Sequence, residues 1–256
     1  MKTVPEHEIS TGAKPVDAPL ADPAAAAENV RQMFDSIASR YDVLNHLLSA
    51  GIDRLWWWRA ARACRATLSR PEAKILDLCC GTGDMALTML RRRPSTASTE
   101  AMLAVDFSHN MLARGNTKFS RYNVLAIEAD ALHLPLADNT LDLISAAFGF
   151  RNLADYAEGL AELYRVLKPG GEIAILECNQ PSGLVGAGYN LYFKKILPRV
   201  GALFSDAAAY TYLPASVERF PRPPRMLELI HRAGFKKGRW TSYTLGVAGL
   251  YQATKG

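Results

Sequence analysis

Several features that would define a protein class are scarce or missing in this sequence. Four cysteines occur among the 256 residues, two of them adjacent, and their spacing matches neither a disulfide framework nor a zinc site. No apolar run approaches the roughly 20 residues that a membrane-spanning helix requires. Hydrophobic residues make up 49% of the chain and charged residues 21%, which excludes a disordered or collagen-like protein. We therefore expect a globular protein of a reducing, cytoplasmic compartment, without a resident metal.

Neither sign of charge dominates the whole chain, but an excess of basic residues is concentrated in one segment. The net charge is +5, and residues 181–240 hold ten Lys or Arg against three acidic residues. A basic segment of this kind can meet nucleic acid, an anionic membrane surface or an acidic substrate, or it can be a solvated face. The charge alone leaves these alternatives open.

The N-terminal quarter divides into a tail and a helical region. Residues 1–27 are rich in Ala, Pro and Asp without an apolar period, and we expect a mobile tail there. From Glu28 onward apolar residues recur at steps of three and four, which is typical of amphipathic helices. Residues 28–70 are therefore predicted to form a helical cap on a single domain that spans residues 28–256.

From Lys74 the pattern changes to alternating strands and helices. Strands are expected at seven apolar runs: 74–80, 102–106, 123–128, 141–147, 172–178, 235–243 and 245–253. Helices are expected between them at 84–93, 109–119 and 155–167. This order predicts an α/β fold with a doubly wound, mostly parallel seven-stranded sheet, whose first five strands are buried on both faces. Residues 182–222 interrupt the alternation and are predicted to be a helical insertion before the last helix.

The most informative segment is residues 75–84, in which a buried strand leads into two glycines and then a helix. In a doubly wound sheet, ligands bind at this position, beyond the carboxyl end of the strand. Gly81 and Gly83 let the backbone turn tightly and approach a ligand closely. Two ligand classes compete for this geometry, a dinucleotide and S-adenosylmethionine.

The acidic residues around the glycines favour S-adenosylmethionine. A pyrophosphate would sit at the helix N-terminus, where Asp84 would repel it, and Asp77 adds a second negative charge before the loop. S-adenosylmethionine carries a sulfonium and an ammonium, which carboxylates attract. Asp106, after the second strand, can accept both ribose hydroxyls, and Asp130, after the third, can accept from the adenine amino group. A nucleotide-linked oxidoreductase is the alternative from another enzyme class.

Residues 77–84 resemble the first motif of class I methyltransferases, with Cys79 where many members carry glycine. Longer segments are similar to the UbiE-like quinone C-methyltransferases, namely residues 33–45, 148–152, 212–217 and 243–251. The resemblance covers most of residues 30–254. It implies a Rossmann-like class I methyltransferase fold and S-adenosylmethionine as methyl donor. It also implies methylation of a ring carbon of demethylmenaquinol or of a benzoquinol precursor of ubiquinone.

The resemblance further implies which residues bind the cofactor and the quinol. By resemblance, the cofactor-binding residues are Thr82, Asp106, Asp130 and Ala131. The position of the loop and strand ends adds Asp77, Gly81, Gly83 and Phe107 to the expected set. Some members also contact the cofactor through a serine, and Ala147 stands at that position here. Arg151 and Asn152 match the pair proposed to lie beside the quinol ring, and they are the expected catalytic residues.

Methyl transfer from a sulfonium makes modest chemical demands. The sulfonium is a good leaving group, so the reaction needs an aligned, electron-rich carbon and no metal. Ionising a quinol hydroxyl makes the adjacent carbon nucleophilic, and Arg151 and Asn152 could stabilise the anion. The base stays open at this point: Tyr41, Asp42, His46 and a water held by Arg151 are all candidates.

Two segments suit a substrate with a polyprenyl tail. The three tryptophans at 56–58 cannot all face one core, so at least one is expected to meet solvent, a partner or lipid. The insertion at 182–222 combines aromatic and aliphatic residues with Lys194, Lys195 and Arg199. Such a segment resembles an interfacial lid, and a dimer interface or a capping subdomain fits it equally well.

The sequence therefore predicts an enzyme that C-methylates a polyprenylated quinol, with demethylmenaquinol and menaquinone biosynthesis favoured. A benzoquinol precursor of ubiquinone remains an alternative substrate, because both rings would satisfy the same Arg–Asn pair. A non-catalytic quinone-binding protein also remains an alternative. The expected setting is the cytoplasm, with transient attachment to the inner face of the membrane and no nucleic-acid partner. A homodimer is left open by the insertion.

Overall fold

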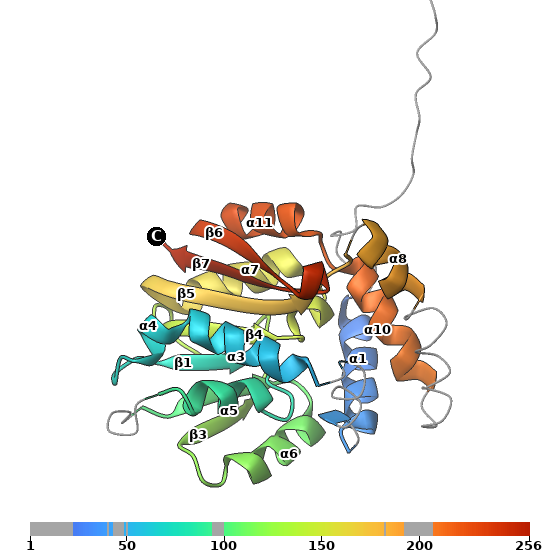
Figure 1. The fold of residues 1–256 in the computed structure, drawn as a ribbon. Coiled ribbons are helices and arrows are strands. Elements are labelled where there is room, and N and C mark those ends of the chain that lie inside the picture. The colour runs from blue at the N-terminus through green and yellow to red at the C-terminus, as the bar shows by residue number, and fades with distance from the viewer. Residues whose placement is uncertain are drawn as a thin grey trace, which may run out of the picture.

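The strands form one seven-stranded sheet, as the alternating pattern predicts (Figure 1). A computed structural model describes residues 23–39, 41–42, 49, 51–93, 100–181, 183–191 and 207–256. Its strands are β1 (Ile75–Leu78), β2 (Met102–Asp106), β3 (Val124–Glu128), β4 (Leu141–Ala147), β5 (Leu167–Cys178), β6 (Phe235–Tyr243) and β7 (Ala248–Lys255). Their order is β3-β2-β1-β4-β5-β7-β6, and β7 runs antiparallel to the other six strands of this described sheet. The predicted doubly wound, mostly parallel architecture is confirmed.

Successive side chains of the central strands enter two separate cores. Ile75 of β1 belongs to the core on one face of the sheet, and Leu76 belongs to the core on the other face. Burial on both faces is confirmed for β1, all of whose residues are buried. It is wrong for β3, where Leu125 is 54% exposed. The reason is its place at the edge of the sheet, which a run of apolar letters does not reveal.

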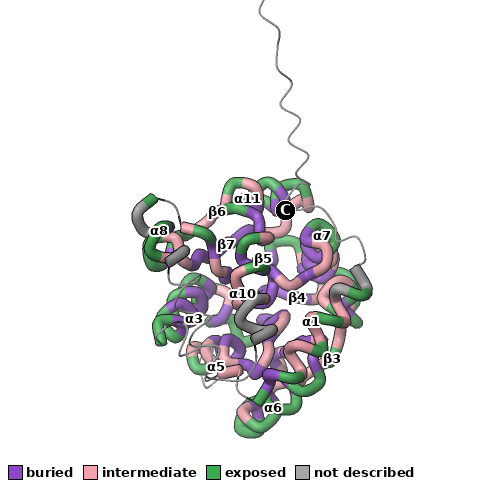
Figure 2. The backbone as a smooth tube through the Cα atoms, turned by 90° about the vertical axis from the view of Figure 1, so that its right-hand side faces the viewer, coloured by how far each residue is buried: buried purple, intermediate pink, exposed green. Residues whose placement is uncertain are grey.

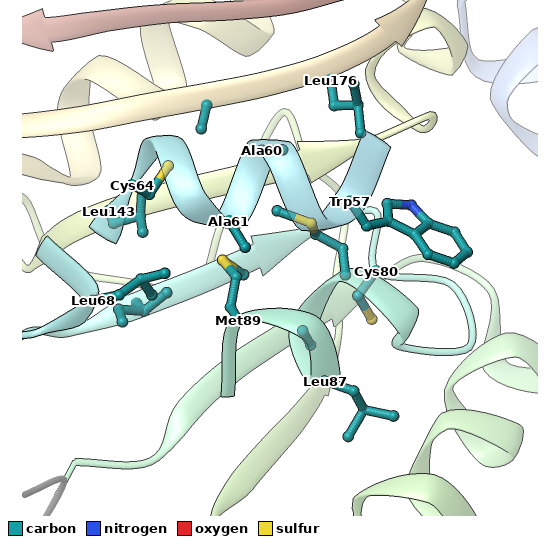
Figure 3. Close-up of a cluster of buried hydrophobic side chains, with 14 of the residues drawn as sticks. Trp57, Ala60, Ala61, Cys64, Leu68, Cys80, Leu87, Met89, Leu143 and Leu176 are labelled. Carbon is teal, nitrogen blue, oxygen red and sulfur yellow. The ribbon is translucent and has the colours of Figure 1, made fainter. Parts of the chain in front are cut away.

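Helices cover both faces of the sheet (Figure 1). The helices of one face are α3 (Asp53–Ala63), α4 (Arg65–Leu68), α5 (Asp84–Leu90) and α6 (His109–Phe119), and those of the other are α7 (Tyr156–Val166) and α11 (Pro223–Arg232). Figure 3 shows how Trp57 and Ala60 of α3, and Cys64 directly after it, lie over the sheet beside Leu143 and Leu176. The predicted helical cap of residues 28–70 therefore needs correction, because α3 and α4 belong to the layer that buries one face of the sheet.

A cap does lie at the carboxyl ends of the parallel strands. It consists of α1 (Pro23–Ile37), α8 (Gly183–Leu191) and α10 (Ala207–Arg219), which stand together at that end of the molecule (Figure 1). The helix α1 begins at Pro23, and not at the predicted Glu28, because the intervening residues are alanines, the strongest helix formers. Figure 2 looks onto this end and shows buried residues gathered along the strands behind the cap.

Several predicted features fall on residues that the structure does not describe. Residues 1–22 of the predicted tail lie outside the described residues, and so do His46 and residues 192–206. The last segment contains Lys194, Lys195 and Arg199, so the interfacial lid stays a prediction. The structure places α8 and α10 before α11, which agrees with a helical insertion at that point. No helix among the described residues has the length and apolar character needed to cross a membrane.

Candidate cofactor and substrate site

A cavity of about 560 Å³ opens where β1, β2, β3 and β4 end, and α1 covers it. This volume lies within the range of sites for small molecules and cofactors. Gly81, Asp106, Phe107, Asp130 and Ala131, five of the eight predicted cofactor-binding residues, line its wall. The structure therefore brings together residues from the ends of three strands, which is what a ligand spanning the edge of the sheet requires.

The two glycines of the loop after β1 have different roles. Gly81 has a φ of +54° and lines the cavity, where a side chain would narrow the space. Gly83 has a φ of +87° but does not line it. A Cβ atom at Gly83 would come 2.2 Å from the Phe119 ring, so this glycine lets the start of α5 pack against α6. Its contact with the cofactor stays a prediction.

Asp106 is fixed by the backbone with its carboxylate at the cavity wall. One oxygen accepts the N–H of Gly81 at 2.8 Å, and the other accepts the N–H of Ser108 at 2.9 Å. Each carboxylate oxygen has a second lone pair, so two further hydroxyl donors can bind. Burial raises the pKa of Asp106 to about 6. A rigid, nearly buried acceptor pair of this kind suits the two hydroxyls of a ribose.

An apolar surface lies next to this acceptor pair. Phe107, Ala131 and Leu132 line the cavity beyond the ends of β2 and β3. Asp130 stands at its exposed edge, with one oxygen accepting the N–H of Leu132 at 2.9 Å. An apolar slot with a carboxylate at its rim can hold a flat base and accept from its amino group. The order of ribose and adenine subsites stays a prediction.

Asp77 lies beneath the loop, outside the cavity lining. Its side chain is fully buried, and Oδ1 accepts the hydroxyl of Ser145 at 2.6 Å. Oδ2 has no hydrogen-bond partner in the described part of the chain. Burial raises the pKa of Asp77 to about 7, and the negative charges of Asp106 and Asp84 add to the effect. A buried carboxylate with an unsatisfied oxygen is costly for the protein alone, but it favours a cation placed nearby.

Thr82 also lies outside the cavity lining and contacts the cap. Its hydroxyl donates to Asp42 at 2.5 Å and accepts from Lys118 at 3.0 Å. Lys118 also forms ion pairs with Asp42, at 2.7 Å, and with Asp84, at 3.1 Å. The contact with Asp42 joins the glycine loop to the segment after α1, and the cofactor contact of Thr82 stays a prediction.

A second contact between cap and sheet lies on the other side of the cavity. Asp35 of α1 accepts the Ser108 hydroxyl at 2.6 Å and the N–H of Asn110 at 3.2 Å. Sequence reasoning missed Asp35, because the partners are 73 and 75 residues apart and neither stands in a recognisable motif. These contacts hold α1 across the cavity, where Phe34 and Tyr41 complete the wall.

Arg151 is buried behind the cavity and is not among the residues that line it. Its guanidinium forms an ion pair with Glu177 at 3.0 Å and donates to the hydroxyl of Ser216 and the carbonyl oxygen of Phe148. Burial opposes the charge, but the attraction of Glu177 outweighs it and raises the pKa of Arg151. The expected direct contact between Arg151 and a quinol ring is therefore not available in this geometry.

Asn152, the second predicted catalytic residue, does line the cavity. Its Oδ1 accepts the hydroxyl of Tyr212 of α10 at 2.9 Å, which leaves the amide nitrogen as a donor. Phe148 and Gly149 form the adjacent wall, and Phe148 has a φ of +59°. Of the candidate bases, Tyr41 lines the cavity.

Cys79 and Gly149 are wall residues whose mutual fit the sequence did not suggest. A Cβ atom at Gly149 would come 2.3 Å from the Cβ of Cys79, so the glycine is required for the loops after β1 and β4 to meet. No three His, Cys, Asp or Glu side chains in the described ranges are grouped as a metal site would need.

The comparisons with known proteins identify the family. The model of the ubiE/COQ5 methyltransferase family matches residues 23–255, nearly the whole described chain. The chain belongs to the ubiE/COQ5 methyltransferase family. It is a class I methyltransferase, and S-adenosylmethionine is the methyl donor that its cavity fits. The alternative of a nucleotide-linked oxidoreductase is thereby set aside.

Relatives in this family cover almost the whole chain. A protein of Deinococcus radiodurans named demethylmenaquinone methyltransferase is 44% identical over 93% of this chain and 97% of its own length. A protein of the same name from Thermus thermophilus is 44% identical over 86% of this chain and 98% of its own. A third, from Geotalea daltonii, is named ubiquinone/menaquinone biosynthesis C-methyltransferase UbiE and is 40% identical over 89% and 97% of the two chains.

Solved structures of lower identity share the fold. A methyltransferase of Thermotoga maritima, described as a possible histamine N-methyltransferase, has a TM-score of 0.63 at 17% identity and covers 88% of this chain and 99% of its own. The [4+2]-cyclase SpnF has the same TM-score at 16% identity and covers 93% and 98% of the two chains. Because one fold carries such different reactions, the substrate of this ubiE/COQ5 family member has to be argued from its site.

Proposed function

We propose that this methyltransferase transfers a methyl group to a ring carbon of a polyprenylated quinol, with demethylmenaquinol as the favoured substrate. The relatives named above support quinone C-methylation, and two of the three are named for demethylmenaquinone. The observation that carries the proposal is a single cavity that combines the Asp106 acceptor pair with a wall formed by Phe148 and Asn152. A benzoquinol precursor of ubiquinone is the second candidate.

The cofactor supplies an activated methyl group on a sulfonium when it is bound. Asp106 holds the ribose hydroxyls through the two lone pairs that the backbone leaves free. Phe107 and Leu132 contact the adenine, and Asp130 accepts from its amino group at the rim. Asp77 places a buried carboxylate under the loop, where its charge attracts the cationic end of the ligand.

The quinol ring is oriented by the loop after β4. Asn152 donates its amide N–H to the ring oxygen, which becomes anionic when its proton passes to water, and Tyr212 keeps the amide in this orientation. The ring carbon loses its own proton to water after it has taken the methyl group and the ring oxygen is protonated again, so that one proton is released for each methyl group transferred. Arg151 acts as a positioning residue, because its contacts with Glu177 and the Phe148 carbonyl fix the loop that carries Phe148 and Asn152. The aromatic walls exclude water and keep the reacting carbon aligned, which is the main requirement of this reaction.

The substrate also decides where the enzyme works. A polyprenyl tail cannot leave a bilayer without a large loss of free energy, since each buried methylene contributes about 0.8 kcal/mol. We therefore propose that the enzyme acts at the inner surface of the membrane, attached reversibly.

A transfer assay with labelled cofactor tests the proposed function. Purified protein is incubated with labelled S-adenosylmethionine and with short-tailed demethylmenaquinol, a benzoquinol precursor, or no quinol. Label in the naphthoquinol product supports the favoured substrate, and label only in the benzoquinol selects the second candidate. Asp106→Asn should lose transfer, whereas Asp138→Asn, which alters an exposed acidic residue outside the cavity, should retain it. If neither the naphthoquinol nor the benzoquinol is methylated, the proposal is refuted.

A further inference from the structure

We propose that one surface of this protein binds the headgroup layer of an anionic lipid bilayer. The surface comprises the outer side of α3 with Arg65 at the start of α4, the end of α5 with the residues that follow it, and the short helix η3 (Thr244–Gly246). We refer to it as the α3–η3 surface. The inference rests on the proposed function, because a substrate dissolved in lipid requires such a surface, but its evidence lies outside the cavity.

Exposed apolar side chains are concentrated on this surface. Six large hydrophobic residues are exposed in the described part of the chain, and four of them lie here: Ile52 (38%), Leu55 (51%), Trp58 (42%) and Leu245 (77%). The first three follow one another at steps of three, so they share one face of α3. The opposite face of the same helix is buried against the sheet (Figure 3). The helix therefore has a second row of apolar side chains that faces solvent and does not pack in the hydrophobic core.

The exposed leucine of η3 is held beside α3. The indole N–H of Trp56 donates to the Thr244 hydroxyl at 2.8 Å. Thr244 and Leu245 have φ values of 47° and 55°, in the left-handed region that residues other than glycine avoid. The chain thus adopts an unfavourable backbone conformation and presents an apolar side chain to solvent at the same position. Insertion of Leu245 into an apolar phase would offset the second cost.

The apolar row is surrounded by arginines. Residues 51–65 and 84–93 hold seven arginines and two aspartates, a net charge of +5 that equals the formal charge of the whole chain. None of the exposed Arg54, Arg62, Arg65 and Arg91 forms an ion pair with a carboxylate in the described residues. Unpaired guanidinium groups attract phosphate, which they can bind through two parallel hydrogen bonds.

Arginine and tryptophan also meet directly on this surface. The guanidinium groups of Arg62 and Arg92 lie over the Trp58 ring, at 5.4 and 4.8 Å from its centre. Trp58 and Arg92 line a shallow depression together with Arg54, Arg65 and Arg91. A tryptophan among basic residues on an amphipathic helix is typical of segments that lie in the interfacial layer of a membrane. A nucleic acid would use the same charges, but it would leave Leu55 and Leu245 exposed.

The position of the surface suits the delivery of a substrate from the membrane. The N-terminal end of α3 lies at the carboxyl end of the sheet, on the side where α1 and α10 stand (Figure 1). The ring of Trp56, next to Leu55 in the chain, lies 5.8 Å from the ring of Phe148 in the cavity wall. A bilayer against the α3–η3 surface would therefore lie close to the site of methyl transfer.

Sedimentation of the full chain with lipid vesicles tests this inference. We expect binding to vesicles rich in phosphatidylglycerol, weakened by salt, and little binding to phosphatidylcholine vesicles. Arg54→Glu/Arg65→Glu should weaken binding by about 30-fold or more, because two charges are reversed. Arg121→Glu/Lys236→Glu is the matched control, since it makes the same change in net charge at exposed positions outside the surface.

A second pair of variants tests the apolar anchors. Leu245→Gly removes the exposed side chain at a backbone conformation that glycine adopts freely, so it should weaken binding about 3-fold or more without lowering thermal stability. Trp58→Phe should bind normally, but it should lose most of the fluorescence quenching that vesicles with brominated acyl chains produce in the unaltered protein.

The outcomes separate this inference from the proposed function. Methyl transfer to a short-tailed, water-soluble quinol should be the same in Arg54→Glu/Arg65→Glu and in the unaltered chain. If both lack this activity, the proposed function is refuted, and the vesicle experiment still decides whether the α3–η3 surface binds lipid. Equal sedimentation of the two double variants would overturn the α3–η3 surface. Binding to a nucleic-acid duplex in place of vesicles would also overturn it.

Discussion

Asp77 gives the protein a pH dependence that can be calculated and measured. Its pKa is raised by burial from an ordinary 3.8 to about 7 in the folded chain. In the window between these values the folded protein holds a proton that the unfolded chain has released, so stability falls as the pH rises. From about pH 5 to about pH 8.5, the unfolding free energy should therefore fall by about 2–3 kcal/mol because of this carboxyl.

Replacement of Asp77 by asparagine removes this dependence. The amide oxygen can still accept the Ser145 hydroxyl, and the amide nitrogen takes the place of an oxygen that has no partner among the described residues. The buried N–H costs about 1–3 kcal/mol, but at every pH alike. From about pH 5 to about pH 8.5, the unfolding free energy of Asp77→Asn should therefore rise by about 2–3 kcal/mol relative to that of the unaltered protein.

Urea denaturation of the cofactor-free protein at the two pH values measures this difference. The exposed Asp138→Asn serves as the control and should show the same pH dependence as the unaltered protein. If Asp77→Asn does the same, to within about 0.5 kcal/mol, the buried carboxyl does not take up the proton and the reasoning fails. Cofactor affinity gives a second readout: it should rise with pH in the unaltered protein and rise less in Asp77→Asn, because the ionised carboxylate attracts the sulfonium.

Three further predictions follow from other parts of the site. Asp106→Ala should weaken S-adenosylmethionine by about 2–4 kcal/mol in a calorimetric titration while the fold persists, and unchanged affinity would show that the ribose lies elsewhere. Arg151→Ala should lower the unfolding free energy by about 3–5 kcal/mol because Glu177 is left buried and unpaired, and a rate loss without this instability would contradict its positioning role. Gly83→Ala should destabilise the chain by about 2 kcal/mol or more, and Phe119→Leu should partly restore it; no rescue would mean that the ring contact is not the cause.

The strands and helices could be predicted closely because their signals are local. The expected strands at 102–106, 141–147 and 235–243 coincide with β2, β4 and β6, and the expected helix at 109–119 coincides with α6. Burial was harder to predict, since β3 has an apolar sequence but lies at the sheet edge. Whether a strand is central depends on the order of all seven, which no single segment encodes.

The candidate site could be predicted where residues follow strand ends, as Asp106 and Asp130 do. It could not be predicted where a side chain has a distant partner. Arg151 and Asn152 are adjacent, but one pairs with Glu177 behind the wall and the other lines the cavity. The sequence gives the same signal for both, because the direction of each side chain is set by the turn after β4.

The contacts that hold the cap have a consequence for the order of events in a catalytic cycle. Asp35 ties α1 to the start of α6, and Asp42 ties the following segment to Thr82 and Lys118, so the cavity is covered at both sides. Because α1 lies across the cavity, exchange of the donor should be faster when these contacts separate. We therefore expect release of the spent cofactor to depend on opening of the cap. With a soluble quinol, the turnover rate would then depend on opening of the cap. Added salt, which screens the partly exposed ion pair between Lys118 and Asp42, would increase that rate.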